Sequence, residues 1–86
     1  MESYKLLIKP SAAKELETLP KKDRKRIATR IQSLAVRPRP AGSEKLSGEE
    51  KYRLRQGDYR ILYLIDDAGL TVTVVKIAHR REVYRK

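Results

Sequence analysis

The sequence of 86 residues contains no cysteine, one histidine and four glycines. Without cysteine the chain can form neither a disulfide framework nor a thiolate metal site. The single histidine, with no spaced cluster of Asp, Glu and His, argues against a catalytic metal. No glycine-rich loop precedes a predicted helix, so a nucleotide-cofactor site is not expected. The sequence therefore predicts neither a metal ion nor a cofactor.

Long apolar runs are also missing. None approaches the ~18 residues that a membrane-spanning helix needs, and Met1-Glu2-Ser3 does not begin a signal peptide. Together with the absence of cysteine, this predicts a cytoplasmic protein. A chain of this size buries roughly 60–68 % of its unfolded surface, which allows one modest core. We therefore expect residues 1–86 to form a single domain.

Acidic residues are scarce relative to basic ones. The chain has 21 Lys and Arg against 11 Asp and Glu, a net charge of +10. Such a charge on a small domain indicates a polyanionic partner. A charge kept for solubility is an alternative, although acidic residues would serve solubility better. An acidic protein partner could use the same charge.

The segment 52–65 predicts a β-hairpin. Residues 52–55 alternate between apolar and arginine side chains, the period-2 pattern of a half-buried strand. Gln56-Gly57-Asp58 supplies the turn, with Gly57 free to take positive φ. Residues 59–65 are apolar except for Arg60, which suits a central strand. The hairpin thus carries Arg53, Arg55 and Arg60, and arginine holds phosphate with a planar fork of donors.

The other segments complete an α+β domain. They predict a strand over 4–9, helices over 11–19 and 21–36, a loop over 37–50, a turn over 66–69, a strand over 70–78 and a basic tail over 79–86. Ser11 is the expected N-cap of the first helix. Pro20 breaks that helix and opens the second. The predicted fold is an N-terminal strand, a helical hairpin and a three-stranded antiparallel meander, forming one sheet with the helices on one face.

Strand alternation predicts which side chains face the helices. The expected inward residues are Tyr52, Leu54, Ile61, Tyr63, Ile65, Val75 and Ile77. Successive side chains alternate, so five cations then face the other way: Arg53, Arg55, Arg60, Lys76 and Arg80. We expect this second face to be open.

The aromatic residues and the histidine are less informative. Alternation places Tyr52, Tyr59 and Tyr63 in the core, whereas Tyr84 in the tail is free to stack on a base. The pKa of a histidine suits a general base. Alternation nevertheless sets His79 on the face away from Arg80, which favours a structural or tail-anchoring role.

Three segments, in this order, resemble the RelE/ParE toxin superfamily and its RelE-type toxins in particular: Lys45–Gly48, Tyr52–Tyr63 and Ile77–Tyr84. The likeness extends over nearly the whole chain. It implies a RelE-like, microbial-RNase-like fold and a type II toxin that cuts mRNA in the ribosomal A site. The implied reaction is metal-free attack of the ribose 2′-hydroxyl on the adjacent phosphate. The implied partners are the ribosome, mRNA and an acidic cognate antitoxin.

The resemblance also implies roles for individual residues. Arg60 and Arg80 match the arginines that stabilise the phosphorane-like transition state, and Tyr84 matches the tyrosine that stacks on the base at the cut. Arg53 and Arg55 stand where founding members have lysines. Further RNA-binding candidates are Lys76, Arg81 and Arg85 in the last strand and tail, and Lys22, Lys25 and Arg30 in the second helix.

The two arginines at lysine positions leave the general base open. Arginine effectively cannot release its proton, so the base is Tyr84, His79 or a ribosomal group. Two other functions remain as alternatives. One is a non-catalytic ParE-type toxin that binds DNA gyrase, and the other is a plain RNA- or DNA-binding module.

Overall fold

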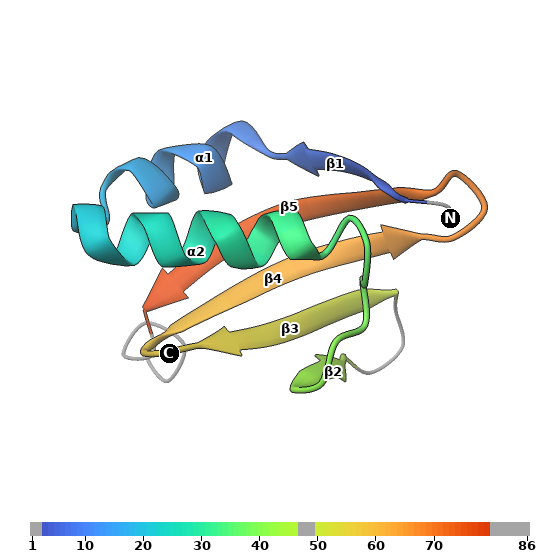
Figure 1. Cartoon of the computed structure of the whole chain (residues 1–86). Coiled ribbons are helices and arrows are strands. Elements are labelled where there is room, and N and C mark those ends of the chain that lie inside the picture. Colours follow the sequence, from blue (N-terminus) through green and yellow to red (C-terminus); the bar gives the residue numbers. More distant parts are fainter. Residues whose placement is uncertain (1–2, 47–49, 80–86) are drawn as a thin grey trace.

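The computed structural model describes residues 3–46 and 50–79. Its elements are β1 (Lys5–Ile8), α1 (Pro10–Glu17), α2 (Lys21–Ser33), β2 (Ser43–Lys45), β3 (Lys51–Gln56), β4 (Tyr59–Asp66) and β5 (Thr71–His79). The strands form one mixed sheet in the order β1-β5-β4-β3-β2. β1 is parallel to β5, and the other neighbours are antiparallel. Figure 1 shows α2 lying over one face of the sheet and α1 next to α2.

One hydrophobic core lies between the helices and the sheet. The helical side contributes Ala12, Ile27, Ile31 and Leu34, and the sheet contributes Tyr52, Leu54, Ile61, Tyr63, Ile65, Val72, Val74 and Ile77. Leu54 and Ile61 oppose each other across the hairpin and are both fully buried. Shortening either to alanine should cost about 2–5 kcal/mol. The prediction of a sheet with both helices on one face is therefore confirmed.

The first helix begins earlier than predicted. Ser11 is not its N-cap, because Pro10 is already helical and Lys9 occupies the cap position without a side-chain hydrogen bond. Proline is tolerated in the first turn, where a backbone N–H has no helical partner in any case. Ser11 therefore lies inside the first turn.

The second helix ends at Ser33 rather than at Val36. The next three backbone N–H groups donate to carbonyls three residues earlier, and Val36 N donates to Ser33 O at 3.2 Å. These tighter bonds are typical of the last turn of a helix. Pro38 restricts the preceding residue to extended conformations, so the helix cannot continue into the loop.

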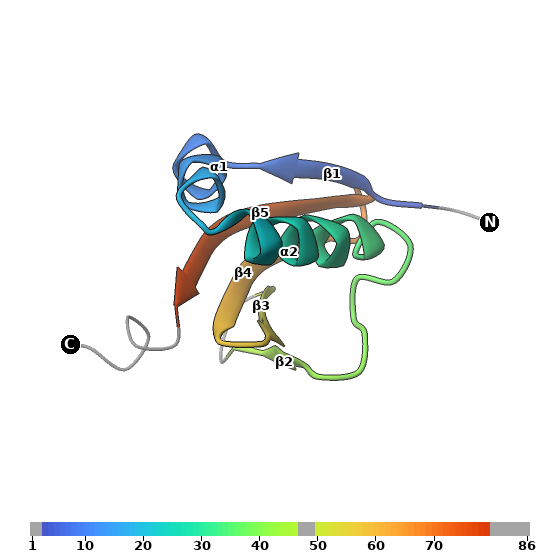
Figure 2. The ribbon, with the colours of Figure 1, turned by 60° about the vertical axis from the view of Figure 1, so that its left-hand side comes forward.

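The short strand β2 was predicted as loop. It pairs with β3 through three residues, Ser43 opposite Leu54, Glu44 opposite Arg53 and Lys45 opposite Tyr52. Three residues are too few for an alternation signal, and their pairing depends on a strand that follows later in the chain. Figure 2 shows the segment after α2 reaching β2, at the opposite edge of the sheet from β1.

An irregularity in β5 changes the predicted alternation. Leu62 pairs with Lys76, whereas the next residue, Tyr63, pairs with Val74, so Val75 is an extra residue. Such a bulge reverses which side chains face inward. Val74 is fully buried and Val75 is only half-buried. The prediction that Val75 faces the core was therefore wrong.

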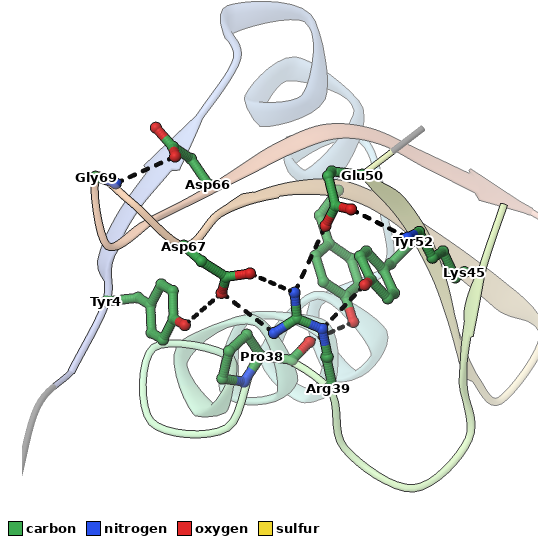
Figure 3. Close-up of polar contacts among 10 residues, drawn as sticks. Tyr4, Pro38, Arg39, Lys45, Glu50, Tyr52, Asp66, Asp67 and Gly69 are labelled. Carbon is green, nitrogen blue, oxygen red and sulfur yellow. Dashed lines mark hydrogen bonds and ion pairs between the residues drawn. The ribbon is translucent and has the colours of Figure 1, made fainter. Parts of the chain in front are cut away.

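Arg39 connects the loop after α2 to the sheet, as Figure 3 shows. Its NH2 donates to Asp67 Oδ2 at 2.8 Å, and its Nε donates to the Tyr52 hydroxyl at 2.9 Å. Asp67 also accepts a hydrogen bond from the Tyr4 hydroxyl at 2.6 Å. The Tyr63 hydroxyl donates to the Pro38 carbonyl at 2.7 Å.

These contacts define the path of the loop just before Gly42 and β2. The hydrogen bond with Asp67 is the main cause that raises the pKa of Arg39, and Arg39 in turn lowers the pKa of Asp67. This network could not be predicted from the sequence, because its members are distant along the chain.

Candidate active site

Three of the predicted arginines meet on the sheet face that the helices leave uncovered. Arg53 and Arg55 alternate with the buried residues of β3, and Arg60 lies directly opposite Arg55 on β4. Together with Gly42 and Glu44 they line a hollow of about 410 Å³. We call this the arginine hollow. Converging guanidinium groups in a concave site are suited to binding a phosphodiester.

Arg60 differs from its neighbours in depth. It is buried, with 8 % of the residue exposed, whereas Arg53 is half-buried and Arg55 is exposed. The expectation that all the arginines stand on an open surface was therefore wrong for Arg60. Alternation predicts the face on which a side chain lies, but not how deeply its neighbours cover it. Because burial lowers the local dielectric, charge on Arg60 acts more strongly on a bound anion than a surface charge does.

Glu44 is a member of the hollow that the sequence did not indicate. Its carboxylate accepts a hydrogen bond from Arg53 NH2 at 2.5 Å, and its side chain is 64 % exposed. That hydrogen bond is the main cause that lowers the pKa of Glu44, and Arg60 adds to it electrostatically. The sequence did not indicate Glu44 because this residue lies beside the arginines only through the pairing of β2 with β3, and β2 was not predicted.

Gly42 provides the open wall of the hollow. Its φ is +94°, a region that favours glycine. A Cβ built at this position would meet nothing within 4 Å. Glycine is therefore favoured here by the backbone conformation, and the hollow is open beside it.

Lys76 lies on the same face but makes a different contact. It pairs with Leu62 in the sheet register, yet its ammonium group donates to Glu15 Oε2 of α1 at 2.9 Å. The other oxygen of Glu15 accepts the backbone N–H of Ile77 at 2.9 Å. Lys76 is thus drawn toward α1 and does not line the arginine hollow.

The three cations predicted on the second helix gather at another place. Lys22, Lys25 and Arg30 line a hollow of about 660 Å³ together with Arg26, Thr29, Ser33 and Gln56. We call this the α2 hollow. Its lining contains no carboxylate among the described residues, and Arg30 Nε is buried there without a hydrogen-bond partner. This basic surface is separate from the arginine hollow, because α2 covers the opposite face of the sheet.

Four of the predicted site residues lie outside the described part of the chain. They are Arg80, Arg81, Tyr84 and Arg85. Their roles remain predictions.

The tyrosines of the sheet are structural. Tyr52 and Tyr63 are buried and stack with their ring centroids 5.8 Å apart. Burial raises the pKa of Tyr63. The half-buried Tyr59 donates its hydroxyl hydrogen to Asp23 Oδ2 at 3.0 Å, and burial followed by this hydrogen bond raises its pKa. The buried rings of Tyr52 and Tyr63 are therefore not available to stack on RNA.

His79 pairs with Tyr59 in the sheet and packs edge-on against the tyrosine ring, with the two ring centroids 5.3 Å apart. Tyr59 alternates with Arg60, so His79 lies on the helix-covered face. The structure therefore separates His79 from the arginine hollow, as alternation predicted.

No group of three or more His, Cys, Asp or Glu side chains that could hold a metal ion occurs in 3–46 and 50–79. In the same ranges, no helix has the length and apolar character that crossing a membrane requires.

Comparison with known proteins gives a consistent result. A family model described as the ParE toxin of the type II toxin-antitoxin system, parDE, matches residues 6–84. Toxin RelE of Mycobacterium tuberculosis is 32% identical over 88 residues, covering 95% of this chain and 87% of that protein. Toxin RelG of the same species is 43% identical over 35 residues, 41% of this chain and 40% of its own length.

Solved structures agree with these sequence matches. The archaeal RelE–RelB complex from Pyrococcus horikoshii aligns with a TM-score of 0.83 and 28% identity, covering 91% of this chain and 96% of that chain. The toxin–antitoxin complex RelBE2 from Mycobacterium tuberculosis aligns with a TM-score of 0.80 and 27% identity, covering 91% and 99%. The predicted RelE-like fold is thereby confirmed.

Proposed function

The chain belongs to the RelE/ParE family of toxins of type II toxin–antitoxin systems, and from this premise we propose that it is a ribosome-dependent mRNA endoribonuclease. It cuts mRNA in the ribosomal A site and thereby inhibits translation in the cytoplasm. The observation that carries the proposal is the arginine hollow, in which Arg53, Arg55 and Arg60 line one concave surface. A toxin that acts by binding alone has no need to converge these cations.

In the proposed reaction the arginine hollow holds the scissile phosphate. Attack by the ribose 2′-hydroxyl builds negative charge on the phosphate oxygens, and preorganised donors lower the barrier by stabilising that charge. Arg60 is the best placed for this role, because it is buried and therefore held in position. Arg80 is its proposed partner, and Tyr84 stacks on the base beside the cut.

The α2 hollow is the proposed contact with ribosomal RNA. Lys22, Lys25 and Arg30 supply the charge for contacts with phosphate groups. Positioning of the substrate by the ribosome supplies the alignment that a domain this small lacks. Naked RNA should accordingly be bound weakly and cut poorly.

An acidic antitoxin is the proposed inhibitor. Two of the structural neighbours are complexes with an antitoxin, and the net charge of +10 favours a partner of opposite charge. Association should slow markedly as salt rises, because screening weakens electrostatic steering.

The test is cleavage of mRNA on purified, programmed ribosomes with mapped product ends. We expect a cut in the A-site codon that leaves a 2′,3′-cyclic phosphate and a 5′-hydroxyl. A message with a single 2′-deoxy nucleotide at the cut is the matched control, because it lacks the nucleophile and should stay intact. Cleavage of that control at the normal rate would contradict the proposed chemistry.

The alternative function is that of a ParE-type toxin that binds DNA gyrase. The description of the matching family model names a ParE toxin, without a target. A supercoiling assay run beside the ribosome assay separates the two functions. Gyrase inhibition without mRNA cleavage would replace the proposal with this alternative. If neither occurs, a plain nucleic-acid-binding module remains.

A further inference from the structure

The segment 39–45 closes on itself through a single glutamate. Arg39 NH2 lies 3.6 Å from Glu50 Oε1, and Lys45 Nζ lies 3.0 Å from Glu50 Oε2. Both contacts are drawn in Figure 3. The two ends of the segment are therefore held at the same place, and the residues between them form a loop. We call it the 39–45 loop.

The middle of the 39–45 loop borders the arginine hollow. Gly42 and Glu44 are among the residues that line the hollow. Glu44 also accepts the hydrogen bond from Arg53 NH2, so the position of the loop decides where one of the three arginines is held. The strand within the loop, β2, is an edge strand that pairs with β3 through only three residues. Because so short a pairing gives little rigidity, the loop needs a fixed base.

Arg39 supplies that base. Its NH1 and NH2 donate to the two oxygens of Asp67 at 3.3 and 2.8 Å, and paired contacts of this kind fix a guanidinium group in direction as well as in distance. Its Nε donates to the Tyr52 hydroxyl at 2.9 Å, and its guanidinium carbon lies 5.2 Å from the centre of that ring. The contacts of Glu50 with Arg39 and Lys45 join exposed side chains and therefore stabilise little. The position of the loop thus depends mainly on Arg39.

We infer that Arg39 is a positioning residue for the proposed cleavage, which acts on the arginine hollow through the 39–45 loop. The inference rests on the proposed function. Arg39 does not itself line the hollow. Its effect is on geometry, because it holds Gly42 and Glu44 at a fixed distance from β3, and with them the width of the hollow and the direction of Arg53. A misplacement of about 1 Å, caused by a change far from the reacting atoms, can slow a reaction by about 10²-fold.

The test uses Arg39→Met and Arg39→Lys in single-turnover cleavage on programmed ribosomes, alongside ribosome affinity, at a temperature at which both variants are folded. We expect Arg39→Met to slow cleavage at saturating protein by about 10–10²-fold and to leave ribosome affinity nearly unchanged. Arg39→Lys should cleave at an intermediate rate, because an ammonium group can contact Asp67 but lacks the planar fork of donors. Wild-type cleavage by Arg39→Met would overturn the inference and leave the proposed function intact.

Val72→Ala is the matched control for stability. Val72 is a fully buried residue of β5 that lines neither the arginine hollow nor the α2 hollow. Its truncation should lower the Tm, because it leaves a cavity in the core, but the folded variant should cleave at the wild-type rate. If Val72→Ala and Arg39→Met instead lose cleavage in proportion to their loss of Tm, then Arg39 acts on overall stability and the inference fails.

A double-mutant cycle with Arg53→Ala tests whether the effect passes through the hollow. If Arg39 acts on Arg53 through the 39–45 loop, then Arg39→Met should slow an Arg53→Ala protein clearly less than it slows the wild type. Equal slowing in the two backgrounds would mean that Arg39 acts elsewhere, which overturns the inference. An inactive wild-type chain would overturn the proposed function itself, and the inference with it.

Discussion

Arg55 and Arg60 lie directly opposite each other across the β3–β4 hairpin. Like charges at opposed positions destabilise an antiparallel pair. The hairpin thus holds two cations at a place where the sheet alone would favour an uncharged or oppositely charged pair. A bound phosphate would relieve the repulsion, so this pairing links the stability of the sheet to its proposed ligand.

Replacing Arg55 with threonine, a good strand residue, should therefore raise the free energy of unfolding at low salt by roughly 0.2–1 kcal/mol. The gain should shrink at high salt, because exposed charges are screened. Urea denaturation at the two salt concentrations measures both effects. Arg53→Thr is the control, since it loses the contact with Glu44 and should gain nothing. Destabilisation by Arg55→Thr at low salt would show that the repulsion is negligible.

The face on which these arginines lie could be predicted, because alternation along a strand is a local property of the sequence. The depth of Arg60 could not, since it depends on what its neighbours cover. The bulge at Val75 could not be predicted either, because it is a property of the register between β4 and β5 and not of one strand alone.

Two further features depend on contacts between segments that are distant in the sequence. Glu44 reaches Arg53 through β2, a strand of three residues with no pattern of its own. Arg39 reads as an ordinary loop residue, although it binds Asp67, which is 28 positions away in the sequence. The sequence therefore indicated the arginines of the hollow and missed both its carboxylate and the Arg39 contacts.

Glu15 should stabilise the part of β5 that follows Val74, where β1 no longer pairs with this strand. It accepts the Ile77 N–H and binds the Lys76 ammonium group. Glu15→Ala removes a charged acceptor and leaves a half-buried N–H without it, which should cost about 1.5–3 kcal/mol. Glu15→Gln keeps an amide oxygen for Ile77 and should cost less. Urea denaturation gives the order, and hydrogen exchange at the Ile77 amide should accelerate more in Glu15→Ala. Equal exchange in the two variants would contradict the role of the acceptor.

The contact between Arg39 and Asp67 should make stability depend on pH. The hydrogen bonds from Arg39 and then Tyr4 lower the pKa of Asp67 below its ordinary value of 3.8. A depressed pKa means that the stabilisation is present above that value and is lost as pH falls through the folded-state pKa. Asp67→Asn should therefore have a lower Tm than the wild type at neutral pH, and the two should converge in strong acid.

Glu17→Gln, on the exposed side of α1, is the control for that experiment because it makes the same change in net charge. Its Tm should follow that of the wild type across the pH range. A difference between Asp67→Asn and the wild type that persists below the folded-state pKa would indicate lost packing rather than a lost ionic contact.

The catalytic assignment of Arg60 gives the last prediction. Because Arg60 is buried, truncation to alanine would leave a cavity and confuse stability with activity. Arg60→Lys keeps the charge but loses the planar fork of donors. If the fork acts on charge that develops in the transition state, this substitution should slow single-turnover cleavage on programmed ribosomes by about 10²–10³-fold. Ribosome affinity should change little.

Arg55→Lys is the matched control, because the same substitution is made at the opposed and exposed position of the same hairpin. A point charge should serve there, since an exposed cation that only attracts the phosphate does not need a fixed fork. We therefore expect Arg55→Lys to cleave at close to the wild-type rate and Arg60→Lys to be slow, with both proteins folded. Equal rates in the two variants would refute the special role of Arg60. A loss of cleavage in Arg60→Lys that is matched by an equal loss of affinity would make Arg60 a binding residue.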